Sequence, residues 1–240
     1  MKRNIIVEGN IGTGKSTFLT ALDTHLGDMV NTVQEPVNEW FKVKDENGVS
    51  LFEHFYKDPS KYSFLLQMNI LSTRYTMLKK HMNNESVRKV NVFERSIFTD
   101  RHVFVESLYD LNHMTSMEYE VFANIFETMK SCASRIDGII YLQCSPQVSH
   151  TRVLQRQRTG EETITLDYLQ TLHKKHEEWL SHSKEIPVFV LDVSQKKPCD
   201  YETSIKHDLM EFIHSWWNGI HSFLMKRNSF IPDETDSSPE

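Results

Sequence analysis

A glycine-rich segment close to the N-terminus constrains the fold of this chain more than any other feature. Residues 9–17 read Gly-Asn-Ile-Gly-Thr-Gly-Lys-Ser-Thr and follow the short apolar run at residues 5–7, with one residue between them. They fit the spacing G-x-x-x-x-G-K-[ST] of a phosphate-binding loop between a strand and a helix. Glycines let the backbone curl so that successive N–H groups point inward, and the N-terminus of the following helix adds partial positive charge. The segment therefore predicts an α/β fold that binds a polyphosphate.

We expect this loop to hold a nucleoside triphosphate together with Mg²⁺. Lys15 would reach the β- and γ-phosphates, and the Ser16 hydroxyl would ligate the metal ion. The alternative is a glycine-rich turn with a chance lysine, but the strand before it, the helix after it and the complete spacing all agree. The loop residues assigned to the nucleotide are Gly9, Asn10, Gly12, Thr13, Gly14, Lys15, Ser16 and Thr17.

Five short runs rich in β-branched residues alternate with helical segments along the chain. This alternation predicts a three-layer fold of the phosphate-loop NTPase type, in which helices cover both faces of a five-stranded parallel sheet. Apolar residues at i, i+3 and i+4 spacing predict two long helices between the strands. The strands are expected at residues 4–8, 31–34, 90–93, 139–142 and 188–191, and the helices at residues 59–81 and 116–131.

The composition allows one sizeable domain and disfavours two classes of partner. The chain has 240 residues, of which 39% are hydrophobic, and we expect one domain over residues 1–230 followed by a disordered tail at 231–240. A net charge of −6 argues against nucleic-acid binding, which needs a basic face. Because no apolar stretch approaches ~20 residues, and the first strand follows Met1 closely, we expect a cytoplasmic protein that does not bind membranes.

Charged residues follow the second and third predicted strands, at the sheet edge where active sites of parallel α/β folds lie. Glu35 is a candidate general base that takes a proton from a hydroxyl acceptor, with a solvated strand-end glutamate as an equal alternative. Glu94 would provide a second Mg²⁺ contact opposite Ser16, and Arg95 would orient a carboxylate or a phosphate. The alternative for Glu94 and Arg95 is a surface salt bridge.

Three arginines predict a mobile lid over residues 152–163. Arg152 and Arg156 share a helix face at i, i+4 spacing, and Arg158 begins a looser segment with Thr159 and Gly160. Arginines that close over a triphosphate neutralise developing charge and exclude water that would otherwise take the phosphoryl group. Without the phosphate loop, a basic solvated face would be the better interpretation.

Taken together, these segments make the chain resemble the deoxyribonucleoside kinase family, and within it the deoxycytidine and deoxyguanosine kinases most. The likeness rests on Glu-Pro-Val-x-x-Trp at 35–40, Glu-Arg-Ser at 94–96 and the arginine pattern of the lid, and it extends from residue 4 to about residue 191. It implies transfer of the γ-phosphoryl group of ATP, or of a similar triphosphate, to the 5′-hydroxyl of a deoxyribonucleoside in nucleotide salvage. In this reaction Glu35 is the general base and Arg95 braces it. The resemblance also implies a helix-bundle homodimer.

The resemblance further assigns the pocket for the deoxyribonucleoside. It implies that Tyr56 and Glu162 hold the sugar 3′-hydroxyl, with Glu161 as the alternative because the lid has one residue more than is usual in the family. Aromatic faces grip a planar base, and an amide can donate and accept hydrogen bonds at once. The residues that the resemblance places on the base are Trp40, Phe104 and Gln67.

A charged pair and one aliphatic residue narrow the choice of base. Arg74 and Asp100 stand where the family members that act on deoxycytidine and purine deoxynucleosides carry such a pair, so thymidine should be a poor substrate. Ile70 stands where these relatives usually have a small residue, and its volume should narrow the pocket against purines. We expect deoxycytidine as the substrate, with a purine deoxynucleoside or broad specificity as the alternative.

Three competing functions have distinguishing features. A thymidylate-type nucleoside monophosphate kinase is expected to show Asp-Arg-Tyr at the end of the third strand, where this chain has Glu-Arg-Ser. A guanine-nucleotide switch needs an Asn-Lys-x-Asp motif, and the sequence contains none. A relative that only binds nucleotide is countered by the presence of Lys15, Ser16, Glu35 and Glu94.

Overall fold

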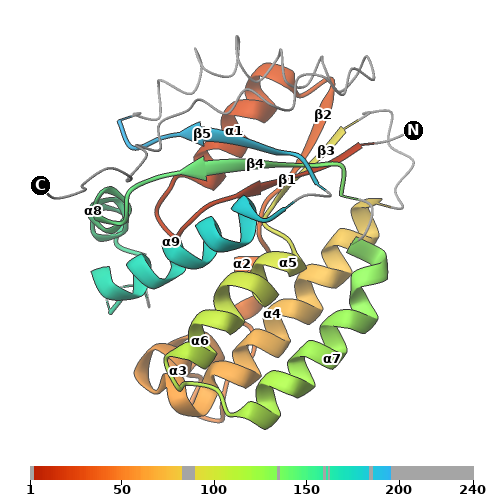
Figure 1. Cartoon of the computed structure of the whole chain (residues 1–240). Coiled ribbons are helices and arrows are strands. Elements are labelled where there is room, and N and C mark those ends of the chain that lie inside the picture. Colours follow the sequence, from red (N-terminus) through yellow and green to blue (C-terminus); the bar gives the residue numbers. More distant parts are fainter. Residues whose placement is uncertain are drawn as a thin grey trace, which may run out of the picture.

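The computed structural model describes residues 3–82, 90–133, 136–158, 161, 163–183 and 186–195. Their centre is a five-stranded sheet in the order β2-β3-β1-β4-β5, and every neighbouring pair of strands is parallel (Figure 1). All five predicted strands are confirmed to within one residue at each end: β1 (Arg3–Glu8), β2 (Val30–Val33), β3 (Val90–Glu94), β4 (Gly138–Gln143) and β5 (Val188–Asp192).

The central strands are continuously apolar because both faces of the sheet are covered. In β1, Ile5 and Val7 pack in a core with α1 (Lys15–Leu26), while Ile6 packs in a second core with α4 (Pro59–Met82) and α7 (Ser116–Ala133). Figure 1 shows α1 on one side of the sheet and α4 and α7 on the other. The predicted three-layer arrangement is therefore confirmed, as expected of a parallel sheet covered by crossover helices.

Both long helices predicted from the periodicity are present as α4 and α7, but several short ones had no prediction. One of them, α3, begins with a capping box in which Ser50 accepts from the Glu53 backbone amide and the Glu53 side chain accepts from that of Ser50. A π-helical stretch, η1, joins two further helices without a break. The unpredicted elements are α2 (Val37–Trp40), α3 (Leu51–Lys57), α5 (Ile97–Thr99), η1 (Asp100–Val105), α6 (Glu106–Asp110) and the longer helix α9 (Leu166–Ser181).

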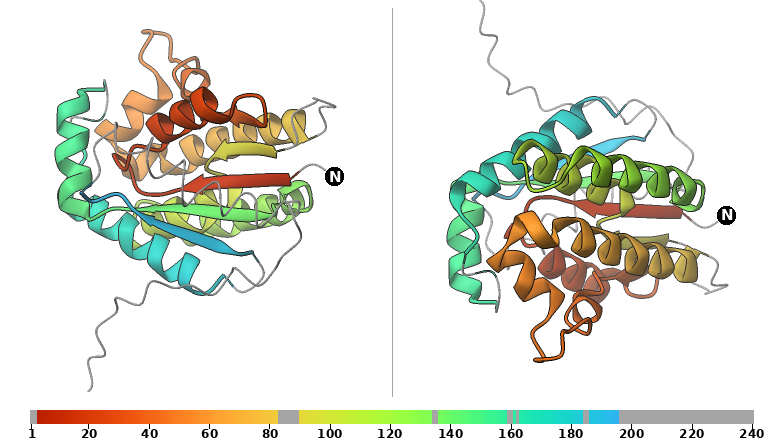
Figure 2. Two further views of the ribbon diagram at one scale, coloured as in Figure 1. Left: turned by 90° about the horizontal axis from the view of Figure 1, so that it is seen from above. Right: turned by 90° about the horizontal axis from the view of Figure 1, so that it is seen from below.

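The predicted lid arginines sit on or after α8 (Pro146–Arg156), which runs across the end of the sheet where the strands finish (Figure 2). A third apolar cluster fixes this helix through Val153 and joins it to Leu169 and Leu172 of α9 (Leu166–Ser181) and to Val103 of η1. None of the helices in the described ranges has the length and apolar character needed to cross a bilayer. The tail expected at 231–240 lies outside the described residues.

Candidate functional site

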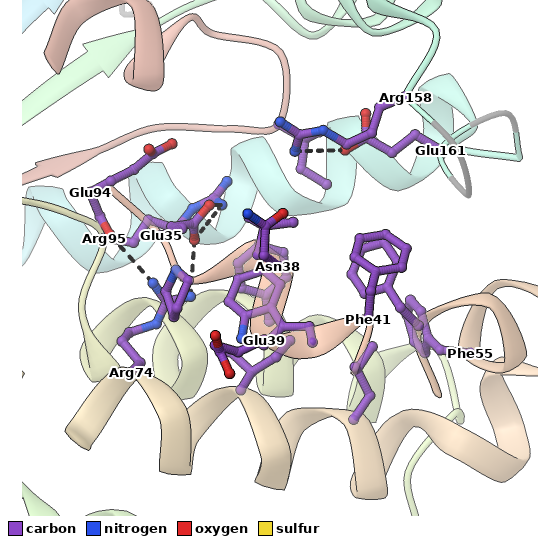
Figure 3. Close-up of a pocket in the computed structure, with 18 of the residues that line it drawn as sticks. Glu35, Asn38, Glu39, Phe41, Phe55, Arg74, Glu94, Arg95, Arg158 and Glu161 are labelled. Atoms are coloured by element: carbon purple, nitrogen blue, oxygen red, sulfur yellow. Dashed lines mark hydrogen bonds and ion pairs between the residues drawn. The ribbon is translucent and has the colours of Figure 1, made fainter. Parts of the chain in front are cut away.

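A cleft of about 780 Å³ opens at the carboxyl ends of β1, β2 and β3. Its walls come from the glycine-rich loop, the segment after β2, α2, α3, α4, η1 and the residues after α8 (Figure 3). This volume lies within the range of small-molecule sites. Hence the predicted sheet edge carries a cavity large enough for two small substrates or parts of them.

Most of the predicted site residues line this one cleft although they come from six separate segments. Those that line it are Gly12, Lys15, Ser16, Glu35, Trp40, Tyr56, Gln67, Ile70, Arg74, Glu94, Arg95, Asp100, Phe104, Arg156 and Arg158. The predicted nucleotide residues that are not among its lining are Gly9, Asn10, Thr13, Gly14, Thr17 and Arg152. Glu162 lies outside the described residues.

The backbone of the loop requires glycine at two positions. Gly14 has φ +91° and forms the N-cap of α1, so the first amides of this helix carry no side-chain cap. Gly12 has φ +83°, and a Cβ there would lie 2.4 Å from the carbonyl oxygen of Ser149 in α8. Such a conformation at the start of a helix presents N–H groups to an anion, as the loop spacing predicted.

Lys15 lies buried at the base of the cleft. Its ammonium donates hydrogen bonds to the carbonyl oxygens of Gly9 (3.0 Å) and Asn10 (2.7 Å). Burial, and next the nearby charge of Arg95, lower the pKa of Lys15 to about 7. A polyphosphate beside this amine would supply the missing negative charge and raise the pKa again.

Three of the residues that do not line the cleft fasten the loop from behind. The Asn10 amide donates to the Leu169 carbonyl of α9 (2.8 Å), and the Thr13 hydroxyl donates to the Asn10 carbonyl (3.1 Å). Arg152 donates to the carbonyl oxygens of Val193 (2.8 Å) and Thr13 (3.4 Å). In this arrangement Arg152 contacts the backbone of the loop, and its contact with a nucleotide stays a prediction.

Glu35 is held by two buried guanidinium groups at the centre of the cleft (Figure 3). Arg95 donates to both carboxylate oxygens at 3.0 Å, and Arg74 donates to Oε1 at 3.0 Å. Burial alone would raise the pKa of Glu35, but the charges of Arg95, Arg74 and Lys15 outweigh it and lower the pKa to about 2. Glu35 is therefore ionised at neutral pH, and the solvated strand-end alternative is wrong because its side chain is only 8% exposed.

Arg74 contacts both Asp100, its partner in the pair predicted to read the base, and the Glu35 carboxylate. Its Nε donates to Asp100 (2.9 Å to Oδ2), and its NH1 donates to the Glu94 carbonyl (3.4 Å). The guanidinium also lies over the ring of Trp40, 5.6 Å from its centroid. Arg74 and Asp100 have side-chain exposures of 1% and 0%. A substitution of Arg74 or Asp100 will therefore also alter the surroundings of Glu35.

Arg95 adopts a backbone conformation that is rare for a residue with a side chain. Its φ is +59°, in the left-handed region, which costs about 1–3 kcal/mol outside glycine. The side chain is fixed by Glu35, by a bond from NH2 to the Gly9 carbonyl (3.2 Å) and by the Phe104 ring 5.1 Å away. Strain held by this many contacts is typical of functional sites. The surface salt bridge considered for Arg95 is excluded because its side chain is only 7% exposed.

Ser16 and Glu94, the predicted metal ligands, lie in direct contact. The Ser16 hydroxyl donates to Glu94 Oε1 at 3.0 Å, and burial, followed by repulsion from Glu35, raises the pKa of Glu94. Mg²⁺ prefers oxygen ligands and usually takes one or two carboxylates together with phosphate and water. This pair of oxygens fits that preference. Among the described residues no group of three or more His, Cys, Asp or Glu side chains forms a metal cage.

An aromatic wall stands opposite the loop. Trp40 stacks near Phe52 (6.3 Å between centroids), and Tyr56 packs edge-on against Phe52 (5.1 Å) and Phe55 (5.0 Å). Gln67 is buried, and its Oε1 has no hydrogen-bond partner among the described residues. An orphaned acceptor in such a wall needs a ligand that donates to it.

Several residues of this wall were not predicted as site residues: Phe41, Phe52, Phe55 and Tyr168. The capping signature Ser50-x-x-Glu53 before an apolar run could have located α3 and with it Phe52 and Phe55. Nothing in the local sequence distinguishes Tyr168 from a core residue of α9.

The lid contributes a buried carboxylate. Glu161 is 6% exposed, lines the cleft, and accepts from Arg158 (3.5 Å) and, at close range, from Arg156. Figure 3 shows Glu161 and Arg158 on the side of the cleft opposite α4. Of the two candidates for the sugar contact, Glu161 is the one that the described residues place in the cleft.

Comparisons with known proteins give a consistent result. A family model described as deoxynucleoside kinase matches residues 5–215. The probable deoxycytidine kinase of Fowlpox virus is 33% identical over 219 residues, which cover 88% of each chain. The deoxycytidine kinase of Homo sapiens is 31% identical over 238 residues (88% of this chain, 91% of the relative), and the mitochondrial deoxyguanosine kinase of Xenopus laevis is 30% identical over 218 residues (80% and 82%).

Proposed function

Because this chain belongs to the deoxynucleoside kinase family, a family of phosphotransferases with an alcohol acceptor, we propose that its preferred acceptor is deoxycytidine. The γ-phosphoryl group of ATP, or of another nucleoside triphosphate, would pass to the nucleoside 5′-hydroxyl. The observation that carries this proposal is the buried cluster in which Asp100, Arg74 and Glu35 are joined within one cleft. Deoxycytidine kinases among the relatives support the choice of base.

The base end of the cleft offers hydrogen-bond acceptors. Asp100 has a carboxylate, and the carbonyl oxygen Oε1 of Gln67 has no partner in the described part of the chain. Cytosine presents an exocyclic amine as a donor, whereas thymine presents a carbonyl oxygen in the same place. The Asp100 carboxylate would attract this amine but repel the carbonyl oxygen of thymine, so thymidine is disfavoured. Ile70 also lines the cleft and occupies volume that a larger purine would need.

At the other end, Glu35 would act as general base. Ionised and held by Arg95 and Arg74, it can accept the proton of the 5′-hydroxyl as phosphoryl transfer proceeds. Lys15 and the first amides of α1 would neutralise the phosphates of the donor. Arg156 and Arg158 would add charge from the lid side.

The sugar would lie between these ends. Tyr56 lines the cleft, and burial raises the pKa of its hydroxyl, which therefore stays a neutral donor at physiological pH. Glu161 would accept from the 3′-hydroxyl. We assign this contact to Glu161 because its buried carboxylate lines the cleft. Two such partners would favour sugars that carry a 3′-hydroxyl in the deoxyribose position.

Mg²⁺ is the metal that we propose for the Ser16 and Glu94 oxygens. Ser16 and Glu94 would hold the ion, and its positive charge would neutralise the phosphates of the donor. The raised pKa of Glu94 supports this assignment, because a cation would favour the carboxylate that burial disfavours.

We also propose that the protein is a homodimer formed through α4 and α7. Large apolar side chains are exposed on both helices: Leu65 (54%), Met117 (77%) and Val121 (45%). A second copy of the chain would cover them. Sedimentation velocity of the wild type should give a dimer and Met117→Glu with Leu65→Glu a monomer, whereas a monomeric wild type would contradict the proposal.

We further propose that the chain forms one kinase domain and that it acts in the cytoplasm. The family match over residues 5–215 supports a single kinase domain within residues 1–230. Three scattered cysteines without a pairing or metal-binding pattern fit the reducing conditions of the cytoplasm.

Incubation of the purified protein with deoxycytidine, ATP and Mg²⁺ tests the proposed reaction. Mass spectrometry should detect deoxycytidine 5′-monophosphate and ADP in equal amounts, and a chelator that removes Mg²⁺ should stop their formation. Formation of ADP without the monophosphate, or of neither product, would refute the proposed function.

A further inference from the structure

Glu8 is a buried carboxyl group for which the proposed reaction has no use. It is the last residue of β1, stands directly before Gly9 of the loop, and has an exposure of 0%. Its Oε1 accepts from the Thr99 hydroxyl (2.5 Å) and more distantly from the Ser96 hydroxyl (3.4 Å). Its Oε2 has no partner among the described residues. A carboxyl group is costly to bury, so this position calls for an explanation.

Both hydroxyl groups that donate hydrogen bonds to Glu8 belong to the capping box of α5. Ser96 is the N-cap and accepts from the Phe98 amide (3.3 Å), while the Thr99 hydroxyl accepts from the Ser96 amide (3.2 Å). One carboxyl oxygen therefore fixes both ends of this single turn. Since α5 continues directly into η1, the same contact sets the position of Asp100. This residue begins the wall of the cleft that η1 forms, which we call the acceptor wall because it would face the nucleoside.

The turn at residues 95–99 is tied to three consecutive residues at the entrance to the loop. The Arg95 amide donates to the Val7 carbonyl (3.0 Å), Thr99 and Ser96 donate to Glu8, and the Arg95 guanidinium donates to the Gly9 carbonyl (3.2 Å). Of these contacts, Glu8 provides the one made by a side chain of β1. The glycine-rich loop, which would hold the phosphate donor, and the acceptor wall are thus joined at the end of β1.

We propose that Glu8 is a positioning residue that holds the Ser96–Thr99 turn against the end of β1 and so fixes the donor loop relative to Asp100, Arg74 and Glu35. The proposal rests on the proposed kinase function, because it concerns the alignment of the two substrates. Phosphoryl transfer depends mainly on such alignment. Burial, opposed by the Thr99 hydrogen bond, raises the pKa of Glu8 to about 7, so a neutral group with the same acceptor can replace it.

Four variants test this role. Thr99→Val and Glu8→Leu remove the contact, and we expect each to lower kcat at least 10-fold. Thr99→Ser and Glu8→Gln keep a hydroxyl and an acceptor of similar size, and we expect kcat within about 3-fold of wild type. Ser107→Ala is the matched control, because it removes another buried hydroxyl nearby whose bond goes to the Val103 carbonyl.

The readout separates positioning from folding and binding. Rates are divided by the concentration of sites that bind deoxycytidine, so unfolded protein does not count. Dissociation constants for deoxycytidine and for a non-hydrolysable ATP analogue are measured separately, and we expect both to change less than 3-fold in Thr99→Val. Combining Thr99→Val with Glu8→Leu should cost less than the sum of the two single losses, because both remove the hydrogen bond between Thr99 and Glu8.

Two results would overturn the role of Glu8. One is a kcat per binding site within 2-fold of wild type in both Thr99→Val and Glu8→Leu. The other is a loss in Glu8→Gln as large as in Glu8→Leu, which would mean that the acceptor contact is not what matters. A wild-type protein that binds both substrates but forms no monophosphate would instead refute the proposed function.

Discussion

Glu35→Gln removes the carboxylate at the centre of the cleft while keeping the size of the side chain. Glutamine cannot take a proton from the 5′-hydroxyl, and a lost general base typically costs 10²–10⁴-fold in rate. We expect kcat for deoxycytidine to fall by about 10²-fold or more. Deoxycytidine binding should change much less, because Gln67 and Asp100, the residues proposed to contact the base, still line the cleft.

The same variant has a stability effect that follows from the pKa of Glu35. Its charged neighbours lower this pKa from an ordinary 4.5 to about 2, and each unit corresponds to ~1.4 kcal/mol. The folded state therefore gains about 3 kcal/mol that is fully present above pH 4.5 and is lost as the pH falls towards 2. Because the substituted amide cannot pair ionically with Arg74 and Arg95, the free energy of unfolding at pH 7 should fall by a comparable amount.

Two assays check these values: steady-state turnover with calorimetric binding of deoxycytidine, and urea unfolding at pH 7 and pH 3. The matched control is Glu39→Gln at the exposed rim, whose carboxylate pairs with Lys42 on the surface and should matter little for either quantity. If Glu35→Gln keeps kcat within 3-fold of wild type, Glu35 is not the base. If its stability deficit is the same at both pH values, the ionic account of the cleft is wrong.

Three further predictions concern specificity, the sugar contact and pH. Arg74→Met with Asp100→Ala should raise the kcat/KM ratio of thymidine to deoxycytidine at least 10-fold, and an unaltered ratio would show that the base is read elsewhere. Glu161→Gln should weaken deoxycytidine binding about 10-fold but leave binding of its 3′-deoxy analogue unchanged; equal losses for both would remove Glu161 from the 3′-hydroxyl. Glu8 has a pKa of about 7 in the folded state against an ordinary 4.5, so ionising it destabilises the folded state as the pH rises from 4.5 to 7. In urea unfolding, the free energy of unfolding of the wild type should fall by about 3 kcal/mol over this range relative to that of Glu8→Gln, and parallel plots of the two against pH would contradict this.

The sheet could be predicted because its signals are local. Apolar runs of four to six residues between helical segments mark buried parallel strands, and the periodicity at residues 59–81 and 116–131 marks two helices. The π-helical stretch η1 could not be predicted, because an additional residue in a helical turn leaves no pattern in the sequence. That stretch begins at Asp100 and therefore determines where one wall of the cleft stands.

The candidate site was predictable where a motif sets both residue and position, as for Lys15 and Ser16 in the loop. The contact between Arg74 and Glu35 was not, because these residues are 39 positions apart and the pairing depends on how α4 crosses the sheet edge. Glu8 was missed for a related reason. A glutamate at the end of an apolar strand has the same local pattern whether it is solvated or buried, and only the tertiary structure places Thr99 against it.

A competition assay with all four natural deoxyribonucleosides tests the central claim most directly. Equal concentrations are incubated together with ATP and Mg²⁺, so that the initial ratios of the four monophosphates equal the ratios of kcat/KM. The buried Arg74–Asp100 pair predicts deoxycytidine monophosphate as the main product and thymidine monophosphate as the least abundant. Thymidine monophosphate as the main product, or no phosphorylated nucleoside at all, would contradict the account.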